Sequence, residues 1–249
     1  MPDIGFWLYQ PAPLSPASEP PDWLSSAERS RWHGHQGAAR ERFSQSRALL
    51  RQALTQQTGE PFADWSLSAK GPPTVVTRPD WRLSLSHTGT LMLAGIAVGG
   101  EVGVDLEERR PERRWRDVAE RWFAPAERDL LATLDDRVGR DVFYLQWTLK
   151  EAWVKATGRG LANHFDSIQL TRNRKGDWCV SGDREEKDWR CRLGYWRDNV
   201  MALVWRLPGQ EPPPLHLLAW KADQPEALLS RHPVDVDWRI DTQIAPRSP

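Results

Sequence analysis

The chain is poor in several features that mark particular classes of protein. Only two cysteines, Cys179 and Cys191, occur in 249 residues, so neither a disulfide framework nor a cysteine-ligated zinc site is expected. No apolar run approaches the roughly 18 residues that a membrane helix needs, and no basic segment precedes an apolar core near the N-terminus, as in a secretory signal. The 34 basic and 34 acidic residues balance, which disfavours a nucleic-acid-binding surface. We therefore expect a cytoplasmic, monomeric protein without membrane or nucleic-acid partners.

Lysine is also scarce. Only six of the 34 basic residues are lysines, and two of them, Lys150 and Lys155, lie five positions apart. Where arginine is the usual cation, a pair of lysines indicates that a compact ammonium group is favoured at that place. The remaining composition, with 39% hydrophobic and 27% charged residues, is typical of a globular protein.

The first hundred residues contain helices followed by strands. Residues 23–56 are predicted to be helical, with a break near Gly34 and Gly37. Three short apolar segments separated by glycine-bearing turns then indicate an antiparallel meander, and these lie at 81–86, 91–98 and 102–107.

The same order returns in the second half of the chain. Two short helices near 117–123 and after Pro125 precede a strong helix over 141–157, and four further strands are expected at 167–171, 177–181, 188–195 and 199–206. Helices followed by strands, twice over, predict an α+β protein with two halves. We place these halves at 1–100 and 101–207, with a C-terminal extension at 208–249.

Two carboxylates lie close together in the last strand of the meander. Asp105 and Glu107 are two residues apart, so both side chains leave the same face of the strand. Like charges this close repel each other unless a cation lies between them. Oxygen ligands of this kind suit Mg²⁺, which takes one or two protein carboxylates and also binds substrate phosphates. A solvated strand end is the alternative interpretation of the same pattern.

The helix over 141–157 has apolar residues on two sides, which predicts that it packs between two layers. Glu151 and Lys155, at positions i and i+4, share the remaining arc with Tyr144 and Thr148. Charged side chains on a helix of this kind are rarely incidental. An ordinary ion pair on a solvated surface is the alternative.

Possible phosphate-binding residues occur in the first half. His87 follows a strand and precedes a Thr-Gly turn, where backbone N–H groups could bind a phosphate. An exposed turn histidine is the alternative. Arginines such as Arg40 and Arg42 on the early helix would by themselves be read as a solvated face.

Four strings carry a resemblance to a known family: SLSHTG (84–89), VGVDLE (102–107), WFAPAE (122–127) and WTLKEAWVKATGRGL (147–161). In this order and spacing they resemble the motifs of the Sfp-type 4'-phosphopantetheinyl transferases. The resemblance implies two similar α+β halves in a pseudo-two-fold arrangement, with coenzyme A in the cleft between them. It also implies Mg²⁺-dependent transfer of the 4'-phosphopantetheine arm of coenzyme A to a serine of an apo acyl or peptidyl carrier protein, with release of 3',5'-ADP.

The resemblance implies roles for the residues of the second half. Asp105, Glu107 and Glu151 would be the magnesium ligands. Glu151, or a water that it orients, would take the proton of the attacking serine. Lys155 would stabilise charge on the phosphates and help to activate the nucleophile, with Lys150 supporting it.

In the first half the implied roles concern coenzyme A. Ser86 and His87 would contact its phosphates, and Arg42 would pair with its 3'-phosphate, for which Arg40 is a weaker candidate. Family members commonly carry G-K-P in the turn before the histidine strand, whereas this chain reads G-P-P. Lys70, one residue before that glycine, is the candidate replacement.

Two other classes of function use similar residues. A magnesium-dependent nuclease or phosphohydrolase also combines carboxylates with a lysine, although many such nucleases carry their E-x-K on a strand. A catalytically silent module that binds coenzyme A or a carrier protein would not need all of Asp105, Glu107, Glu151 and Lys155.

Overall fold

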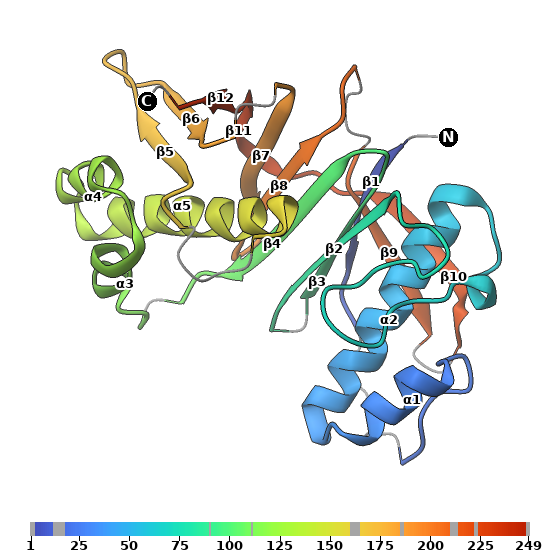
Figure 1. Ribbon diagram of the computed structural model, residues 1–249. Coiled ribbons are helices and arrows are strands. Elements are labelled where there is room, and N and C mark those ends of the chain that lie inside the picture. The colour runs from blue at the N-terminus through green and yellow to red at the C-terminus, as the bar shows by residue number, and fades with distance from the viewer. Residues whose placement is uncertain are drawn as a thin grey trace. The chain divides into compact units, whose positions relative to one another are not determined.

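The computed structural model describes residues 3–11, 18–89, 91–110, 112–159, 165–184, 187–209, 214–221 and 224–247. The chain divides into two units (Figure 1). The first unit contains residues 1–100 and 210–234, and the second contains residues 101–209 and 235–249. The segment 208–249, expected as a separate extension, therefore supplies strands to both units. None of the described helices combines the length and the apolar character needed to cross a bilayer.

The first unit consists of one five-stranded sheet and the helices that pack with it. Its strands, in the order β10-β9-β1-β3-β2, are β1 (Ile4–Tyr9), β2 (Trp81–Thr88), β3 (Leu91–Val98), β9 (His216–Lys221) and β10 (Gln224–Pro233). Its helices are α1 (Ser26–His33), α2 (Gly37–Thr58) and the short 3₁₀ helix η1 (Phe62–Asp64). The break expected between two early helices is present.

Local signals explain where the helices of the first unit begin and end. Ser25 caps α1 and forms a capping box with Glu28, which satisfies two backbone N–H groups at the start of the helix. Gly59 ends α2 with a φ of 81°, a left-handed conformation that glycine adopts without steric cost. The core of this unit joins leucines of α2, including Leu50 and Leu54, to side chains of β3.

The second unit contains a four-stranded sheet in the order β11-β7-β8-β4 and a three-stranded sheet in the order β12-β6-β5. The strands are β4 (Glu101–Glu108), β5 (Ile168–Arg172), β6 (Trp178–Gly182), β7 (Trp189–Trp196), β8 (Asn199–Arg206), β11 (Asp237–Gln243) and β12 (Ala245–Pro246). The helices are α3 (Trp115–Trp122), α4 (Pro125–Ala132) and α5 (Asp136–Thr157).

The two units share the central part of their topology. In the first unit, β1 is followed by helices and then by the hairpin β2–β3, whose second strand pairs with β1. In the second unit, β4 is followed by helices and later by the hairpin β7–β8, whose second strand pairs with β4. The expected α+β class with two similar halves is confirmed. The expected meander over 81–107 is wrong in its last strand, because β4 pairs with β8 and not with β3.

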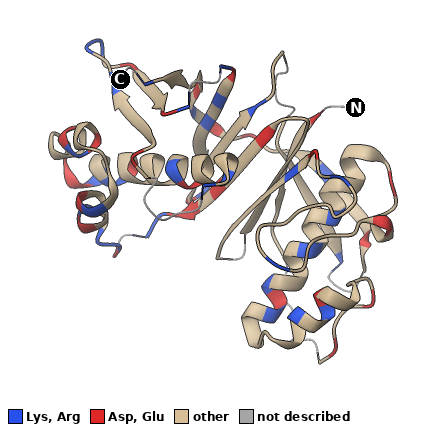
Figure 2. Ribbon diagram, in the orientation of Figure 1, with Lys and Arg blue, Asp and Glu red and all other residues tan. Residues whose placement is uncertain are grey.

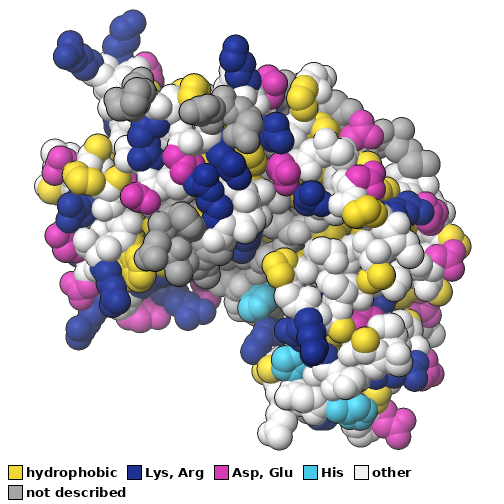
Figure 3. Space-filling view, viewed as in Figure 1, with side chains coloured by type: hydrophobic (Ala, Val, Ile, Leu, Met, Phe, Trp, Pro, Cys, Tyr) yellow, Lys and Arg dark blue, Asp and Glu magenta, His cyan; other side chains and the backbone are white. Residues whose placement is uncertain are grey.

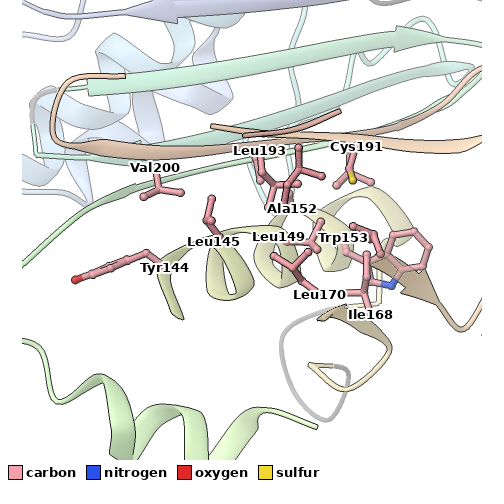
Figure 4. Packing of buried hydrophobic residues seen from close by; sticks show 14 of the residues in the cluster. Tyr144, Leu145, Leu149, Ala152, Trp153, Ile168, Leu170, Cys191, Leu193 and Val200 are labelled. Atoms are coloured by element: carbon pink, nitrogen blue, oxygen red, sulfur yellow. The ribbon is translucent and has the colours of Figure 1, made fainter. Parts of the chain in front are cut away.

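Helix α5 packs between two layers, as its two apolar faces predict (Figure 4). Leu149 and Trp153, both 0% exposed, belong to one hydrophobic cluster with Leu193 of β7 and Ile168 of β5. Burying a side chain of this size stabilises the fold by about 1.5–3 kcal/mol. The helix is therefore held on both sides, which fixes the direction of its remaining polar face.

Helix α5 approaches β4 very closely at Gly103. A Cβ atom built on Gly103 would lie 1.9 Å from the carbonyl oxygen of Ala152 and 2.5 Å from the backbone nitrogen of Ala156. Only glycine permits such a contact between two backbones. Because Gly103, Asp105 and Glu107 alternate along one strand, all three lie on the same face. The glycine thus lets the helix pack directly on the carboxylate-bearing face of β4.

We expect Gly103→Ala to destabilise the protein, because the added methyl group can be accommodated only by moving α5 away from β4. The free energy of unfolding should fall by about 1–3 kcal/mol or more, measured by urea or thermal unfolding. Gly34→Ala is the matched control, since a Cβ there would meet only the carbonyl oxygen of Arg31, at 3.3 Å. Equal stability of the Gly103 variant and the wild type would contradict the need for this close approach.

Candidate active site

The centre of the site is an ion pair between β4 and α5. Lys155 Nζ donates to Asp105 Oδ1 at 2.7 Å and to the carbonyl oxygen of Val104 at 3.2 Å. The side chain of Asp105 is 5% exposed, whereas that of Lys155 is 29% exposed. Figure 2 shows the acidic positions along β4 and the basic positions along α5. The ammonium group therefore reaches solvent while neutralising a buried carboxylate.

Glu107 has a partner on each carboxylate oxygen. Trp147 donates its indole N–H to Glu107 Oε1 at 2.8 Å, and Arg113 lies 3.4 Å from Glu107 Oε2. Burial raises the pKa of Glu107, the charge of Asp105 raises it further, and Arg113 opposes the increase. Glu107, Arg113, Arg110 and Glu112 line a hollow of about 390 Å³.

Glu151 differs from the other two carboxylates. Within the part of the chain that the structure describes, its side chain has no hydrogen bond or ion pair. Burial, and next the charge of Asp105, raise the pKa of Glu151 to about 7, and Lys155 opposes the shift. Glu107 also contributes to the increase. The three carboxylates therefore influence one another electrostatically, and an added cation would relieve their repulsion.

The donor chemistry suits a magnesium ion. As placed, no three His, Cys, Asp or Glu side chains among the described residues lie close enough together to hold a metal. Magnesium, however, needs only one or two protein carboxylates and keeps several waters. Asp105 and Glu107 leave the same face of β4, and Glu151, which has no hydrogen bond or ion pair within the described ranges, has a pKa raised by both of them. These residues fit a hard divalent cation.

Lys150 does not lie with Lys155. Its side chain is 0% exposed and pairs with the equally buried Glu127 at 2.6 Å. Lys150 Nζ also donates to the carbonyl oxygens of Phe165 and Ile168, at 2.5 and 2.7 Å. The expected support of Lys155 by Lys150 therefore does not come from an exposed ammonium group, because Lys150 Nζ bonds to Glu127 and to two backbone carbonyls inside the core.

The candidates of the first unit occupy different positions within it. Ser86 is buried and His87 is exposed, and as consecutive residues of β2 they point to opposite faces of the sheet. A joint contact of both side chains with one phosphate is therefore not favoured by their placement. His87 lies on the same face of β2 as Leu83, and Leu83 belongs to the hydrophobic cluster that includes residues of α2.

Basic and histidine side chains gather over α1 and the start of α2 (Figure 3). The guanidinium carbon of Arg40 lies 4.0 Å from the centroid of the Trp32 ring, and its Nε donates to the carbonyl oxygen of His35. Arg42 is exposed, and among the described residues it has no hydrogen-bond or ion-pair partner. Lys70 is exposed as well, next to Ala69.

Comparisons with known proteins show the family to which the chain belongs. Residues 101–204, which include β4 and α5, match the family model described as the 4'-phosphopantetheinyl transferase superfamily. The chain is 30% identical over 199 residues to the Synechocystis sp. protein slr0495, a candidate 4'-phosphopantetheinyl transferase, a match that covers 73% of this chain and 79% of that protein. The chain belongs to the 4'-phosphopantetheinyl transferase family. The family that the motifs indicate is thereby confirmed.

Further relatives match a smaller share of the chain. The 4'-phosphopantetheinyl transferase HetI of Nostoc sp. is 34% identical over 154 residues, which are 60% of this chain and 63% of HetI. Among solved structures, a holo-(acyl-carrier-protein) synthase from Bacillus anthracis is 21% identical, with a TM-score of 0.37, covering 42% of this chain and 93% of that one. That structural likeness is too low to bear on the site.

The sequence does not predict two of the side chains that contact Glu107. Trp147 reads as part of an apolar patch, and Arg113 as one of many arginines in a charged run, yet both contact Glu107. The sequence does show that Trp147 precedes Glu151 by four residues. This spacing places both side chains on one face of the helix, so Trp147 could be expected near the carboxylates.

The raised pKa of Glu151 predicts how the stability of the metal-free protein depends on pH. The pKa is about 7 in the folded protein against an ordinary value of 4.5, so the folded state binds the proton more tightly. The free energy of unfolding should therefore decrease as the pH rises from about 4.5 to about 7 and then level off. Urea unfolding in EDTA at several pH values measures this dependence.

Glu151→Gln is the control for this prediction, because it keeps the shape of the side chain and cannot ionise. The difference in unfolding free energy between wild type and this variant should decrease with rising pH. A difference that stays constant over the whole range would contradict the raised pKa.

Proposed function

We propose that this 4'-phosphopantetheinyl transferase moves the 4'-phosphopantetheine arm of coenzyme A onto a serine of an apo acyl or peptidyl carrier protein, with Mg²⁺ as the required metal. The serine hydroxyl attacks the β-phosphate of coenzyme A, and 3',5'-ADP leaves. The observation that carries the proposal is the contact of Asp105 with Lys155 beside Glu151. Phosphoryl transfer depends mainly on positioning and charge neutralisation, and this arrangement supplies both.

Asp105, Glu107 and Glu151 are the proposed magnesium ligands, and they would have to draw together around the ion, because no three such side chains among the described residues lie close enough to hold it as placed. When bound, Mg²⁺ supplies positive charge that draws the pyrophosphate of coenzyme A to this face and stabilises the departing phosphate. The hydrogen bond from Trp147 and the ion pair with Arg113 hold Glu107 in place. The burial of Asp105 limits the directions in which its carboxylate can turn.

Lys155 is proposed to stabilise charge on the transferred phosphoryl group. An ammonium group has three N–H donors, and two of those of Lys155 bond to Asp105 and to the backbone of Val104. The third donor has no hydrogen-bond partner among the residues that the structure describes, so it is available to a phosphoryl oxygen. Because the ammonium group is already bonded to Asp105, the lysine side chain loses little additional conformational freedom when substrate binds.

Glu151 is proposed to accept the proton of the serine hydroxyl, directly or through a water. A general base works best when its pKa lies close to the working pH. Burial and the neighbouring Asp105 raise the pKa of Glu151 to about 7. Without metal, this carboxyl group holds a proton more tightly than an ordinary glutamate, and a bound cation would lower its pKa again.

Coenzyme A is proposed to contact residues of the first unit as well. Arg42 is the preferred partner of the 3'-phosphate, because Arg40 already stacks on Trp32. Lys70 and His87, both exposed, are further candidates for contacts with the phosphates. Ser86 remains a candidate through its position at the end of β2.

The direct test is incubation of the protein with coenzyme A, Mg²⁺ and a panel of apo carrier proteins, followed by mass spectrometry. The proposal predicts that the carrier gains the mass of phosphopantetheine on its serine, and that 3',5'-ADP appears in equal amount. Cleavage of plain nucleic acid or of other phosphate esters without transfer would favour the hydrolase alternative. Binding of coenzyme A without any reaction would favour the silent module.

Lys155→Ala should lower kcat by about a hundredfold or more, with a smaller effect on KM for coenzyme A, because the ammonium charge matters most while the phosphoryl group is transferred. Steady-state kinetics with saturating carrier protein measure both constants. Lys175→Ala, at an exposed lysine of the second unit, should behave like wild type. An effect of Lys155→Ala confined to KM would reduce its role to substrate binding.

Arg42→Ala should raise KM for coenzyme A by roughly tenfold to a hundredfold, since charge-assisted hydrogen bonds contribute about 1.5–3 kcal/mol. Dephospho-coenzyme A, which lacks the 3'-phosphate, should cause a similar loss with the wild type. Combining the variant with this substrate should cost little more than either change alone, because interacting partners are non-additive. Fully additive losses would rule out the contact and make Arg40 and Lys70 the next candidates.

A further inference from the structure

Trp147 connects the carboxylate site to the aromatic core of the second unit. Its indole N–H donates to Glu107 Oε1 at 2.8 Å. Its ring stacks on that of Phe165, with centroids 5.1 Å apart and an interplanar angle of 18°. The guanidinium carbon of Arg113, the other partner of Glu107, lies 4.7 Å from the centroid of the Trp147 ring. Trp147 therefore contacts Glu107, Arg113 and the aromatic core.

The stacking partner of Trp147 is itself fixed. Phe165 is 6% exposed, and its carbonyl oxygen accepts a hydrogen bond from Lys150 Nζ at 2.5 Å. Lys150 is held by Glu127 at 2.6 Å, with both side chains fully buried. Buried and paired charges move little, because separating them would leave an uncompensated charge in the core. The orientation of the indole is thus set by the core and not by the surface.

The chemistry of the indole suits the orientation of a metal ligand. An indole N–H is a neutral donor with no acceptor capacity. It can hold one oxygen of Glu107 without cancelling the negative charge that a cation requires. Arg113 offers a longer contact of 3.4 Å to the other oxygen, and a guanidinium charge competes with a cation. Of the two partners, only Trp147 can hold the carboxylate firmly and leave its charge intact.

We propose that Trp147 is a positioning residue that orients Glu107 for Mg²⁺, and that Lys150 and Phe165 fix the orientation of Trp147 from the core. This inference rests on the proposed function, because it assumes a metal at Glu107. It gives Lys150 a role that does not involve contact with substrate. Partners that orient metal ligands in this way typically change metal affinity by about 10- to 100-fold when they are removed.

The test compares Trp147→Phe with Trp122→Phe. The first variant keeps an aromatic ring against Phe165 and loses the N–H donor. The second removes an indole that also packs against Phe165, with ring centroids 5.7 Å apart, and leaves Glu107 untouched. Titration calorimetry with Mg²⁺ alone, and thermal unfolding of each variant, are measured beside the wild type. We expect Mg²⁺ affinity to fall by about 10- to 100-fold in Trp147→Phe and to stay unchanged in Trp122→Phe.

A double-variant cycle with Glu107→Gln separates positioning from general packing. If Trp147 acts through Glu107, adding Trp147→Phe to Glu107→Gln should weaken Mg²⁺ binding little further. Additive losses, or equal losses in the two tryptophan variants, would overturn the positioning role. Wild-type Mg²⁺ affinity in Trp147→Phe would overturn it as well, while leaving the proposed function standing. Wild-type protein that transfers the arm without binding Mg²⁺ would instead overturn the metal assignment on which both depend.

Discussion

The contact between α5 and β4 at Gly103 is the constraint on which the site depends. A side chain larger than hydrogen at this position would meet the backbone of α5 at 1.9 Å, so the helix could not lie against the strand. With the helix in place, Lys155 reaches Asp105 and Trp147 reaches Glu107. The two pairs follow β4 in one direction and α5 in the other, so one packing contact aligns both pairs. The stability of this packing and the geometry of the site therefore have the same origin.

The second unit contains two kinds of ion pair with different consequences. Lys150 and Glu127 are both fully buried and bond to each other and to backbone groups. Removing one partner from such a pair costs about 3–5 kcal/mol, so these residues belong to the framework. Lys155 and Asp105 instead lie where the ammonium is 29% exposed. That pair can exchange its partners with an incoming phosphate or cation, which is what a site for phosphoryl transfer requires.

Much of this arrangement could be predicted from local patterns. The two-sided helix over 141–157, the break between the early helices and the shared face of Asp105 and Glu107 all depend on short-range periodicity, and each agrees with the structure. The family motifs identified the carboxylates and Lys155 together. The pairing of β4 with β8 and the parallel pairing of β9 with β1 join segments far apart in the chain, and no local pattern specifies such partners.

The position of Lys150 illustrates a different limit. Its five-residue separation from Lys155 corresponds to about 140° around a helix, so one lysine faces the carboxylates when the other faces away. Proximity in sequence suggested a shared task, whereas helical geometry separates the two. The buried partner of Lys150, Glu127, lies on another helix and could not be deduced from α5 alone. The apolar pattern of the helix likewise predicts Trp147 only as a core residue, although its indole N–H determines its contact with Glu107.

The most direct test of the central claim is a crystal structure with coenzyme A and Mn²⁺, which replaces Mg²⁺ and gives an anomalous signal. If the face of β4 against α5 forms the metal and phosphate site, the anomalous peak will lie at the carboxylates of Asp105 and Glu107, with Glu151 and the pyrophosphate beside it. Lys155 should then contact a phosphoryl oxygen. A peak elsewhere in the protein, with these carboxylates keeping the partners that they have without metal, would contradict the account.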